Sequence, residues 1–478
     1  MKRIHLLIPC FLMMQLNLLS QNYHAVQGSS NAGVLGVDNN PASIVNVADA
    51  WNFSPFSLQY KTSTNAFTVL NYSLISSPKN SLYRINSGSY DRYAYGNFNM
   101  HLFNTRIAIN RRQAFAFGMN VKGYSQIKTA EYNFADTLNT LKSFLKINEG
   151  TENLEGNFKS SNWVEVFGTY SHTVWDNEIS RLNGGITIKA MRGISGAFAS
   201  LRNAGFSRNI QNNQASYILR TGNARYGYSS NLDKWGNGNS TSGNLKDLFV
   251  AAEGGLSFDL GLEYLVKTQA VHNYYEEDSY YDYEWKIGFS LLDVGANQYK
   301  FSAQSRALGN AKENITDRIL ENKFDVNGLK SFNDSLSSVL NNVQQLTGKF
   351  TIINPARLVI NIDRYLYDDF YVNGELSVNL TAFAGTERLY TSELNALTVT
   401  PRWETRRLGI YLPVQFNTKK QFWIGGAFKA GPLLLGVHNW ANVFAKNKFQ
   451  NGGAYLALIF RPGQYTRSAR DQRYNCPK

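Results

Sequence analysis

The stretch that decides the fold reads FAFGMNVK and occupies residues 115–122. Every second side chain from Phe115 to Val121 is apolar, and the side chains between them are small or polar, ending at Lys122. Successive side chains of a β-strand point to opposite faces of the sheet. The stretch therefore predicts a strand with one apolar face and one small or polar face.

The same alternation recurs at 182–189, 370–378, 408–415 and 422–429. In a soluble β-sandwich the apolar face would pack on a second sheet, within domains of about 100 residues joined by linkers. The chain has only 10 Pro and no Pro/Ser-rich linker. We therefore expect an all-β protein, a transmembrane antiparallel β-barrel of about 14 strands, with the sandwich as the alternative.

The composition supports a membrane barrel. Hydrophobic residues make up 43% of the chain, charged residues 17% and aromatic residues 14%. A mean hydropathy of -0.33 is too low for a helical membrane protein. Half of each barrel strand faces lipid and half faces water, and aromatic girdles mark both interfaces, which accounts for this combination.

The N-terminus predicts export. Lys2 and Arg3 precede an apolar run over residues 6–19, so residues 1–20 are interpreted as a cleaved signal peptide. Lipidation of Cys10 is the alternative, but the cysteine lacks a preceding small residue. Cleavage would leave Cys476 as the one cysteine, which excludes an intramolecular disulfide. We expect the mature protein in the cell outer membrane.

The alternation assigns side chains to the two faces of the barrel. Lipid-facing positions are predicted at Phe115, Phe117, Phe370, Val372, Phe422 and Ile424. Lumen-facing candidates are Lys122, Lys189, Asn373, Glu375 and Lys429. A lumen lined in this way would be polar and partly charged.

Residues 21–50 are predicted to form a plug inside or across the periplasmic end of the barrel. The segment is rich in small residues, which permit close approach of the backbone. Asn40 can cap a short helix that Pro41 begins. The plug motif consists of Gly33, Gly36, Asn40, Pro41 and Ala42.

The rest of the chain is assigned as barrel, residues 51–463, and a basic C-terminal tail, residues 464–478. Long loops are expected at about 126–160, 194–248 and 268–282. An insertion at about 309–347 has apolar residues at helical spacing and is interpreted as an amphipathic cap over the barrel mouth. They are Ile315, Ile319, Leu320, Leu336, Val339, Leu340 and Val343.

The Asn40-Pro41-Ala42 motif, placed after a Gly/Ala-rich stretch and before the first strand, resembles the N-terminal hatch of the long-chain fatty acid transporter (FadL-like) superfamily. The same three residues recur at 354–356, so the position of the first motif carries the resemblance. It implies a plugged barrel that transports hydrophobic molecules.

The C-terminal part gives a second resemblance. LGIYLPV at 408–414, AGPLLLG at 430–436 and the ending RYNCPK at 473–478 resemble the domain-of-unknown-function 5723 family of Bacteroidota outer-membrane barrels. This resemblance implies a fold and a location but no reaction. Phe460 is followed by a basic tail, whereas many outer-membrane barrels end on an aromatic residue.

No motif for a catalytic, metal or cofactor site is identified, and we expect a protein that is not an enzyme. Ser171 beside His172, or His438 beside Asn439, would be the residues for a lipase-like site, and a background occurrence is the favoured interpretation. The acidic run at 276–284 is interpreted as a solvated loop, with a Ca²⁺ site as the alternative.

Two hypotheses for function remain. The barrel takes up a hydrophobic or amphipathic small molecule past the plug, or it anchors surface, secretion or gliding machinery. Export argues against nucleic acid as the partner of a chain with net charge +13; outer-membrane lipids and lipopolysaccharide phosphates are the expected partners. A continuous apolar pocket would favour transport, and a lumen filled by side chains would favour anchoring.

Overall fold

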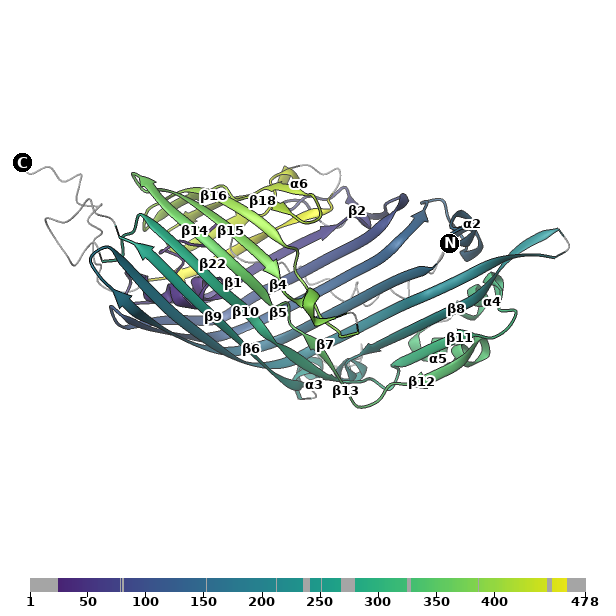
Figure 1. Ribbon diagram of the computed structural model, residues 1–478. Helices are drawn as coiled ribbons and strands as arrows, with labels where there is room; N and C mark the ends of the chain where they lie inside the picture. Colours follow the sequence, from purple (N-terminus) through teal and green to yellow (C-terminus); the bar gives the residue numbers. More distant parts are fainter. Residues whose placement is uncertain are drawn as a thin grey trace, which may run out of the picture.

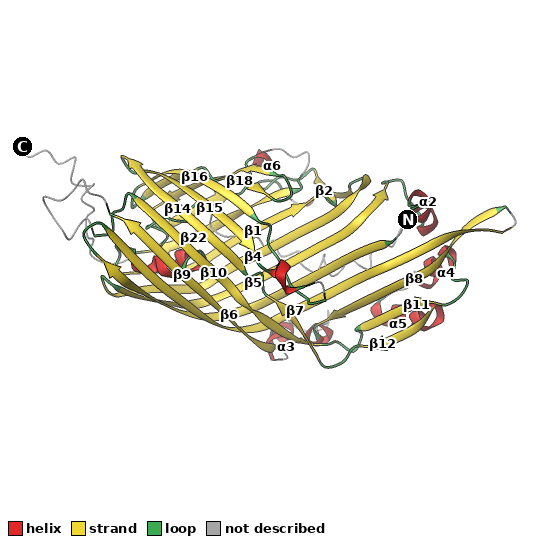
Figure 2. Ribbon diagram, viewed as in Figure 1, coloured by secondary structure: helices red, strands yellow, loops and turns green. Residues whose placement is uncertain are grey.

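The computed structural model describes residues 25–77, 79, 81–151, 153–211, 213–234, 241–250, 252–267, 280–324, 328–385, 387–444 and 449–461. Its strands form a closed antiparallel barrel of 14 strands (Figures 1 and 2), as the alternation predicts. The expected signal peptide and C-terminal tail lie outside the described residues. Among the residues described, no helix is long and apolar enough to cross a membrane.

Each barrel strand pairs with its neighbour along the chain, and β22 closes the ring by pairing with β1. In order around the barrel the strands are β1 (Trp51–Thr64), β4 (Gly88–Asn110), β5 (Gln113–Phe134), β6 (Leu154–Asp176), β7 (Ser180–Gln211), β9 (Glu253–Val266), β10 (Trp285–Lys300), β13 (Lys349–Ile353) continued by β14 (Arg357–Tyr367), β15 (Phe370–Asn379), β16 (Ala396–Glu404), β17 (Leu408–Tyr411) continued by β18 (Val414–Asn417), β19 (Phe422–Ile424) continued by β20 (Gly426–Ala430), β21 (Leu433–Val437) and β22 (Asn451–Phe460).

Three positions of the wall are interrupted strands. Pro413 separates β17 from β18, and Gly425 separates β19 from β20. The second Asn-Pro-Ala sequence, at 354–356, separates β13 from β14, because proline cannot donate a ladder hydrogen bond. This copy of the motif is therefore part of the wall and not of the plug.

The two ends of the barrel differ in their connections. At one end, here called the short-turn end, turns of two or three residues join β4 to β5, β6 to β7, β14 to β15, β16 to β17 and β20 to β21. The connections at the opposite end, the long-loop end, are mostly longer and carry additional elements. Short turns face the periplasm and long loops face outward in outer-membrane barrels.

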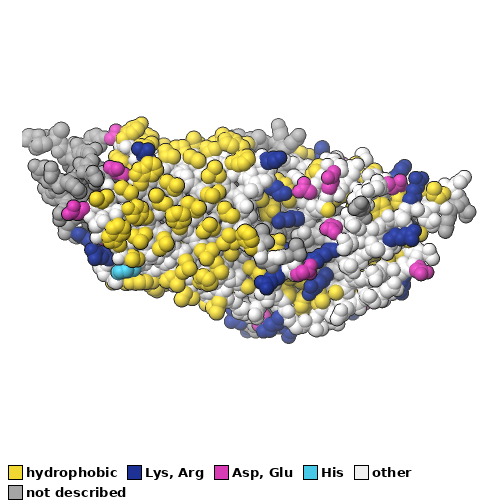
Figure 3. Space-filling model, viewed as in Figure 1, with side chains coloured by type: hydrophobic (Ala, Val, Ile, Leu, Met, Phe, Trp, Pro, Cys, Tyr) yellow, Lys and Arg dark blue, Asp and Glu magenta, His cyan; other side chains and the backbone are white. Residues whose placement is uncertain are grey.

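Exposed apolar side chains occur on strands all around the barrel, and on the face shown in Figure 3 they form a broad band. The predicted lipid-facing side chains lie on the outer face: Phe117 is 38% exposed, Phe422 is 62% exposed, and Val372 is half-buried. Charged side chains gather outside this band on the face shown in Figure 3. The band is the part of the surface suited to lipid.

Two expected loops contain long pieces of strand. The range 126–160 contains the end of β5, a helix α2 (Leu141–Ile147) and the start of β6, and 194–248 contains the end of β7 and strand β8 (Gln214–Tyr228). Period-two alternation is weak here because these strands extend beyond lipid, where both faces meet water. The bounds of the expected long loops were therefore wrong for both ranges, because strands and helices occupy much of them. Most of 268–282 lies outside the described residues.

The long-loop end carries an extension of the wall. β7 pairs with β8, β8 with β11 (Arg306–Ala311), and β11 with β12 (Leu340–Gln345), forming a four-stranded sheet that reaches beyond the apolar band (Figure 1). A separate two-stranded sheet joins β2 (Phe67–Leu70) to β3 (Leu82–Ile85). The remaining helical elements are α3 (Thr241–Val250), α6 (Ala441–Phe444), η4 (Ser230–Lys234) and η6 (Thr381–Ala384).

The predicted helical insertion is only partly helical. Its ends are β11 and β12, and only α4 (Asp317–Phe324) and α5 (Leu329–Val339) are helices. They pack on the outer face of the extension, where the Tyr226 ring contacts Phe332 and its hydroxyl donates to Asn333. The expected cap over the mouth was therefore wrong, because the apolar residues of α4 and α5 cover the sheet itself.

Candidate functional site

The described part of the predicted plug, residues 25–50, lies inside the barrel and contains two 3₁₀ helices, η1 (Gly33–Asp38) and η2 (Pro41–Val45). The Asn40 side chain accepts a hydrogen bond from the Ala42 amide at 2.9 Å, and Pro41 occupies the first turn. Proline suits this position because its missing N–H would have no partner within the helix. The motif thus forms a rigid turn, as its residue types predict.

The two plug glycines of the motif permit close packing. Gly33 has φ +59°, a left-handed conformation, and a Cβ there would lie 2.9 Å from Asn52 Oδ1, the atom that accepts from the Val34 amide. A Cβ on Gly36 would lie 2.7 Å from Ser43 Oγ. Gly33 therefore requires a residue without a side chain, whereas a side chain at Gly36 would require the Ser43 hydroxyl to move.

Three wall glycines form a seat for the Asn40-Pro41 turn. A Cβ on Gly185 would lie 2.5 Å from the Ala42 nitrogen, and one on Gly261 would lie 2.1 Å from Asn40 Oδ1. Gly185 and Gly261 are direct partners across β7 and β9, and Gly288 on β10 faces Asn40 Nδ2. Adjacent strands thus leave a recess of backbone into which the plug fits.

Hydrogen bonds fasten the turn in this seat. Asn40 Nδ2 donates to the Leu262 carbonyl at 2.8 Å, and Ser171 Oγ donates to the Ala42 carbonyl at 3.1 Å. Ser290 Oγ donates to the Asn39 carbonyl at 2.6 Å. Each such bond contributes about 0.5–1.5 kcal/mol, so the turn is held by several weak contacts.

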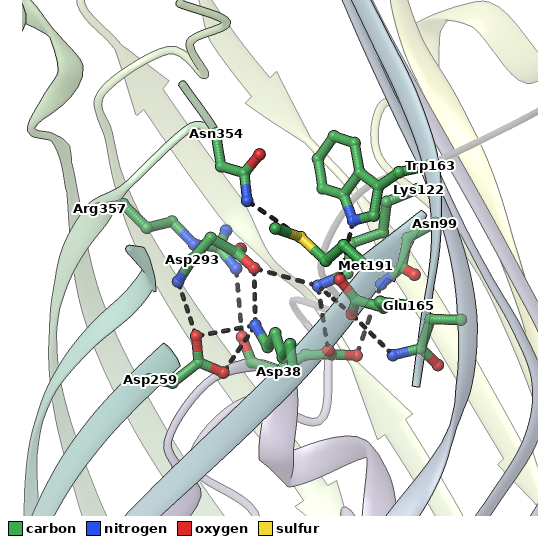
Figure 4. Close-up of polar contacts among 12 residues, drawn as sticks. Asp38, Asn99, Lys122, Trp163, Glu165, Met191, Asp259, Asp293, Asn354 and Arg357 are labelled. Atoms are coloured by element: carbon green, nitrogen blue, oxygen red, sulfur yellow. Dashed lines mark hydrogen bonds and ion pairs between the residues drawn. The ribbon is translucent and has the colours of Figure 1, made fainter. Parts of the chain in front are cut away.

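Asp38, at the end of η1, joins the plug to a buried ion cluster (Figure 4), which we call the latch. Its carboxylate lies 2.7 Å from His101 Nε2 and 3.8 Å from Lys122 Nζ. Lys122 also contacts two wall carboxylates; they are Glu165 at 3.0 Å and Asp293 at 3.2 Å. Asp38 is the latch carboxylate that the plug supplies.

The latch continues along the wall. Asp293 Oδ1 lies 2.6 Å from Lys189 Nζ, which also contacts Asp259 at 2.7 Å. Arg357 donates to the Asp38 carbonyl at 3.1 Å and pairs with Glu393 at 3.2 Å. All of these side chains except Asp38 belong to the barrel wall or, for Glu393, to the loop between β15 and β16. The latch therefore connects the plug to strands on several sides of the barrel.

A second ion cluster holds the start of the plug. Ser29 Oγ donates to Glu404 at 2.6 Å, and Glu404 pairs with Lys429 at 2.8 Å and Arg402 at 3.1 Å. Arg402 makes two further bonds to Asp363, at 2.6 and 2.8 Å. Bidentate pairing of this kind fixes geometry as well as charge.

Towards the short-turn end the plug is held by arginines. Arg106 donates to the carbonyls of Ile44, Val47 and Asp49. The Asp49 carboxylate pairs with Arg461 at 3.2 Å and with Arg406 at 2.5 Å. The segment just before β1 is thus fixed to the wall.

The five lumen-facing candidates are all buried. Asn373 exchanges two amide hydrogen bonds with Asn361 and packs against plug Gly28, where a Cβ would lie 2.2 Å from Asn373 Nδ2. Glu375 hydrogen-bonds Asn39 of the plug. Lys122, Lys189 and Lys429 belong to the two ion clusters, so the structure brings all five to the surface around the plug.

A family model described as "Family of unknown function (DUF5723)" matches residues 44–437. The chain belongs to this family. The match begins within the plug and ends in β21, so it covers nearly the whole wall that surrounds the latch. No curated protein matches the sequence.

Three solved structures illustrate what the chain is similar to. The P. putida toluene transporter TodX is similar over 89% of this chain and 92% of its own, with 10% identity and a TM-score of 0.40. The Escherichia coli outer membrane protease OmpT matches over 86% and 94% with 6% identity and a TM-score of 0.20. The siderophore receptor PirA from Pseudomonas aeruginosa matches over 86% and 81%, with 10% identity and a TM-score of 0.19.

Several residues of this site were not singled out from sequence. Asp38, His101, Glu165, Asp259 and Asp293 have no common motif. The usable signal was the same alternation. Asp259 and Glu263 alternate with the exposed Phe258, Leu260 and Leu262 along β9, which places them in the lumen. Which lumen carboxylate meets which lysine depends on the curvature of the barrel.

The residues considered for a lipase-like site do not assemble. Ser171 faces the plug, whereas His172 is on the opposite face of the same strand. His438 is buried against the Tyr455 ring. Within the described ranges no group of three or more His, Cys, Asp or Glu is placed to hold a metal ion; residues 276–278 of the acidic run lie outside them.

The plug leaves little space beside it. A cavity of about 30 Å³ lies between the plug and the wall, lined in part by Glu263, Lys286 and Asn361. This volume holds about one or two water molecules. The plug and the ion clusters thus close the described lumen at this level.

Proposed function

We propose that this protein is a gated barrel of the cell outer membrane that takes up a small molecule, with the plug as its gate. The observation that carries the proposal is how the plug is held. Over residues 25–50 it makes no β-ladder with the wall. Side-chain hydrogen bonds, ion pairs and a small apolar contact, in which Val34, Val37, Ile44 and Val45 pack on Ala114, Ala116 and Phe167, hold it in place. Such contacts can be exchanged one at a time for contacts with water or a ligand.

The lining of the lumen favours an amphipathic molecule over a hydrocarbon. Lys122, Glu165, Asp293 and Arg357 lie directly along the passage that opens if the plug moves. An apolar molecule passing these groups would take away their water without replacing its hydrogen bonds. A molecule with a polar end can supply these bonds in turn.

The test removes the charge by which the plug joins the latch. Asp38→Asn weakens the contacts to His101 and Lys122, while Lys122 keeps two wall carboxylates and the wall stays intact. A hydrogen bond to a charged group contributes about 1.5–3 kcal/mol. Because each 1.4 kcal/mol changes an equilibrium about tenfold, the open fraction should rise about tenfold or more.

The measurement is solute flux into proteoliposomes, with Asp259→Asn as the matched control. Asp259 belongs to the same latch and contacts Lys189 but not the plug. Flux should rise for Asp38→Asn and stay at the wild-type value for the control. Equal flux in both variants would reject a gate at Asp38.

Anchoring of surface or secretion machinery is the second candidate, favoured by the filled lumen and by the extension with its helices. Deleting residues 28–46 separates the two proposals. A folded barrel with raised flux supports uptake. A folded barrel that stays closed to solutes, and still copurifies with a partner protein from native membrane, supports anchoring.

A further inference from the structure

One half of the barrel wall is taller than the other at the long-loop end, and its inner face is open. Beyond the apolar band, β5, β6 and β7 continue into the extension of β8, β11 and β12 (Figure 1). On the opposite side, β15 ends at Asn379 and β16 begins at Ala396. The inner face of the taller half therefore forms a trough that faces the mouth.

Strand register identifies the side chains of this trough. Lys128 is on the same face of β5 as buried Lys122, and its partner across the strands is Asn157. Continuing across the sheet, Asn157 pairs with Ser200, Ser200 with Arg225, Arg225 with Ala307, and Ala307 with Gln344. The next row towards the plug contains Gln126, Lys159 and Phe198.

The trough is open because α4 and α5 occupy the other face of the extension. Tyr226, next to Arg225 and so on the opposite face, contacts α5. Arg225, Gln344, Asn223 and Asn342 are exposed. Ala307 and Gly309, on the central strand β11, are small, which leaves a shallow path between the exposed amides.

The trough has an excess of positive charge. Among the described residues, no carboxylate lies within ion-pair distance of Lys128, Lys159 or Arg225. Aromatic rings contact them instead: Lys128 lies 5.5 Å from the Tyr95 ring, Lys159 3.8 Å from the Tyr390 ring, and Arg225 5.5 Å from the Phe198 ring. The nearby Glu387 is already paired with Arg202 at 2.8 Å.

The neighbouring positive charges also affect the protonation of Lys159. Lys159 lies beyond the lipid-facing band, and burial, together with the charges of Lys128 and Arg202, lowers its pKa to about 8. A bound anion would relieve this repulsion.

A cleft adjoins the trough at its β13 side. Its volume is about 480 Å³, and Arg225, Lys349 and Arg388 line it together with Phe301, Phe350 and Leu389. Cations and aromatic side chains thus continue from the trough into an open cleft, which Glu387 also lines and where Lys349 pairs with Glu253 at 2.8 Å.

We propose that the trough binds an acidic oligosaccharide. Its cations attract carboxylate or phosphate groups. Exposed Asn and Gln side chains can donate to one sugar hydroxyl and accept from the next. The partly exposed rings of Tyr95, Tyr390 and Phe301 offer surface for the apolar face of a sugar. From Lys128 to Gln344 the row crosses five strand spacings, about 24 Å, which is longer than a single sugar ring.

Binding at the trough requires no movement of the plug, so its test is independent of the proposed gate. The probe is a hexamer of galacturonic acid, added to the full-length purified barrel in detergent and followed by calorimetry. The double variant Lys128→Gln/Arg225→Gln should lower the affinity by about tenfold or more. The control Arg318→Gln/Lys330→Gln removes the same charge from exposed positions of α4 and α5 and should leave affinity unchanged.

Three further outcomes decide the proposal. Affinity for the hexamer should fall with salt, and as pH rises through about 8, where Lys159 loses its proton. A neutral malto-oligosaccharide of equal length should bind at least tenfold more weakly. Equal binding of the neutral sugar, equal losses in both double variants, or preferential binding of hexaglutamate would overturn the assignment, the last in favour of an acidic peptide.

Discussion

The inner face of this barrel carries lysine and arginine at two levels, and their partners differ. Around the plug, Lys122, Lys189 and Arg402 each contact at least two carboxylates. In the trough, Lys128, Lys159 and Arg225 face aromatic rings and amides. Buried charges must be paired because desolvation is costly, whereas the half-buried or exposed charges of the trough keep part of their water. The first level therefore holds the structure closed, and the second is available to a ligand.

Removing a paired cation should give the largest effect. Arg402→Leu leaves Asp363 and Glu404 buried without their guanidinium, and breaking a buried pair in this way costs about 3–5 kcal/mol. Arg225→Leu in the trough should change stability by about 0.5 kcal/mol or less. Urea unfolding in lipid vesicles measures both, and similar losses would remove the distinction between the two levels.

A charge on the lipid-facing side gives the next largest effect. Phe117→Arg places a cation in the apolar band and should cost about 2–4 kcal/mol of folding free energy. The structure changes the choice of control: Asn120 is buried and donates to Glu165, so an arginine there would disturb the latch. Asn157→Arg in the trough is the better control variant, and it should leave the folding free energy nearly unchanged. If both variants unfold at the same urea concentration, the assigned faces are wrong.

Neighbouring glycines of β7 provide a finer comparison. Gly185→Ala places a Cβ 2.5 Å from backbone atoms of the plug, whereas Gly184→Ala points away, 3.5 Å from Val174. Overpacking costs about 1–3 kcal/mol, so the first variant should displace the turn at Asn40. Protease cleavage between residues 28 and 46 should increase for Gly185→Ala alone; equal protection of both would mean that the seat is looser than the contacts indicate.

The sequence by itself determined the strand architecture and the two faces of the wall. Alternation over 115–122 and its repeats reflects a bilayer on one side and a polar lumen on the other, and this pattern is local. Residue types also predicted the turn at Asn40-Pro41, because capping and a preset proline φ act within a few residues. The place of Lys122 in the lumen follows from its position in the alternation.

Only the tertiary structure decided which groups meet. Asp38 contacts His101 and Lys122 because η1 enters a closed ring, and no spacing in the chain encodes that distance. Gly185, Gly261 and Gly288 form one seat because three strands are adjacent in register. The helices of 309–347 could not be placed from their periodicity, since an apolar stripe requires a covering surface but does not say which one. The trough cations without a carboxylate partner could likewise be identified only from the structure, because ion pairing depends on which side chains lie close together in the folded barrel.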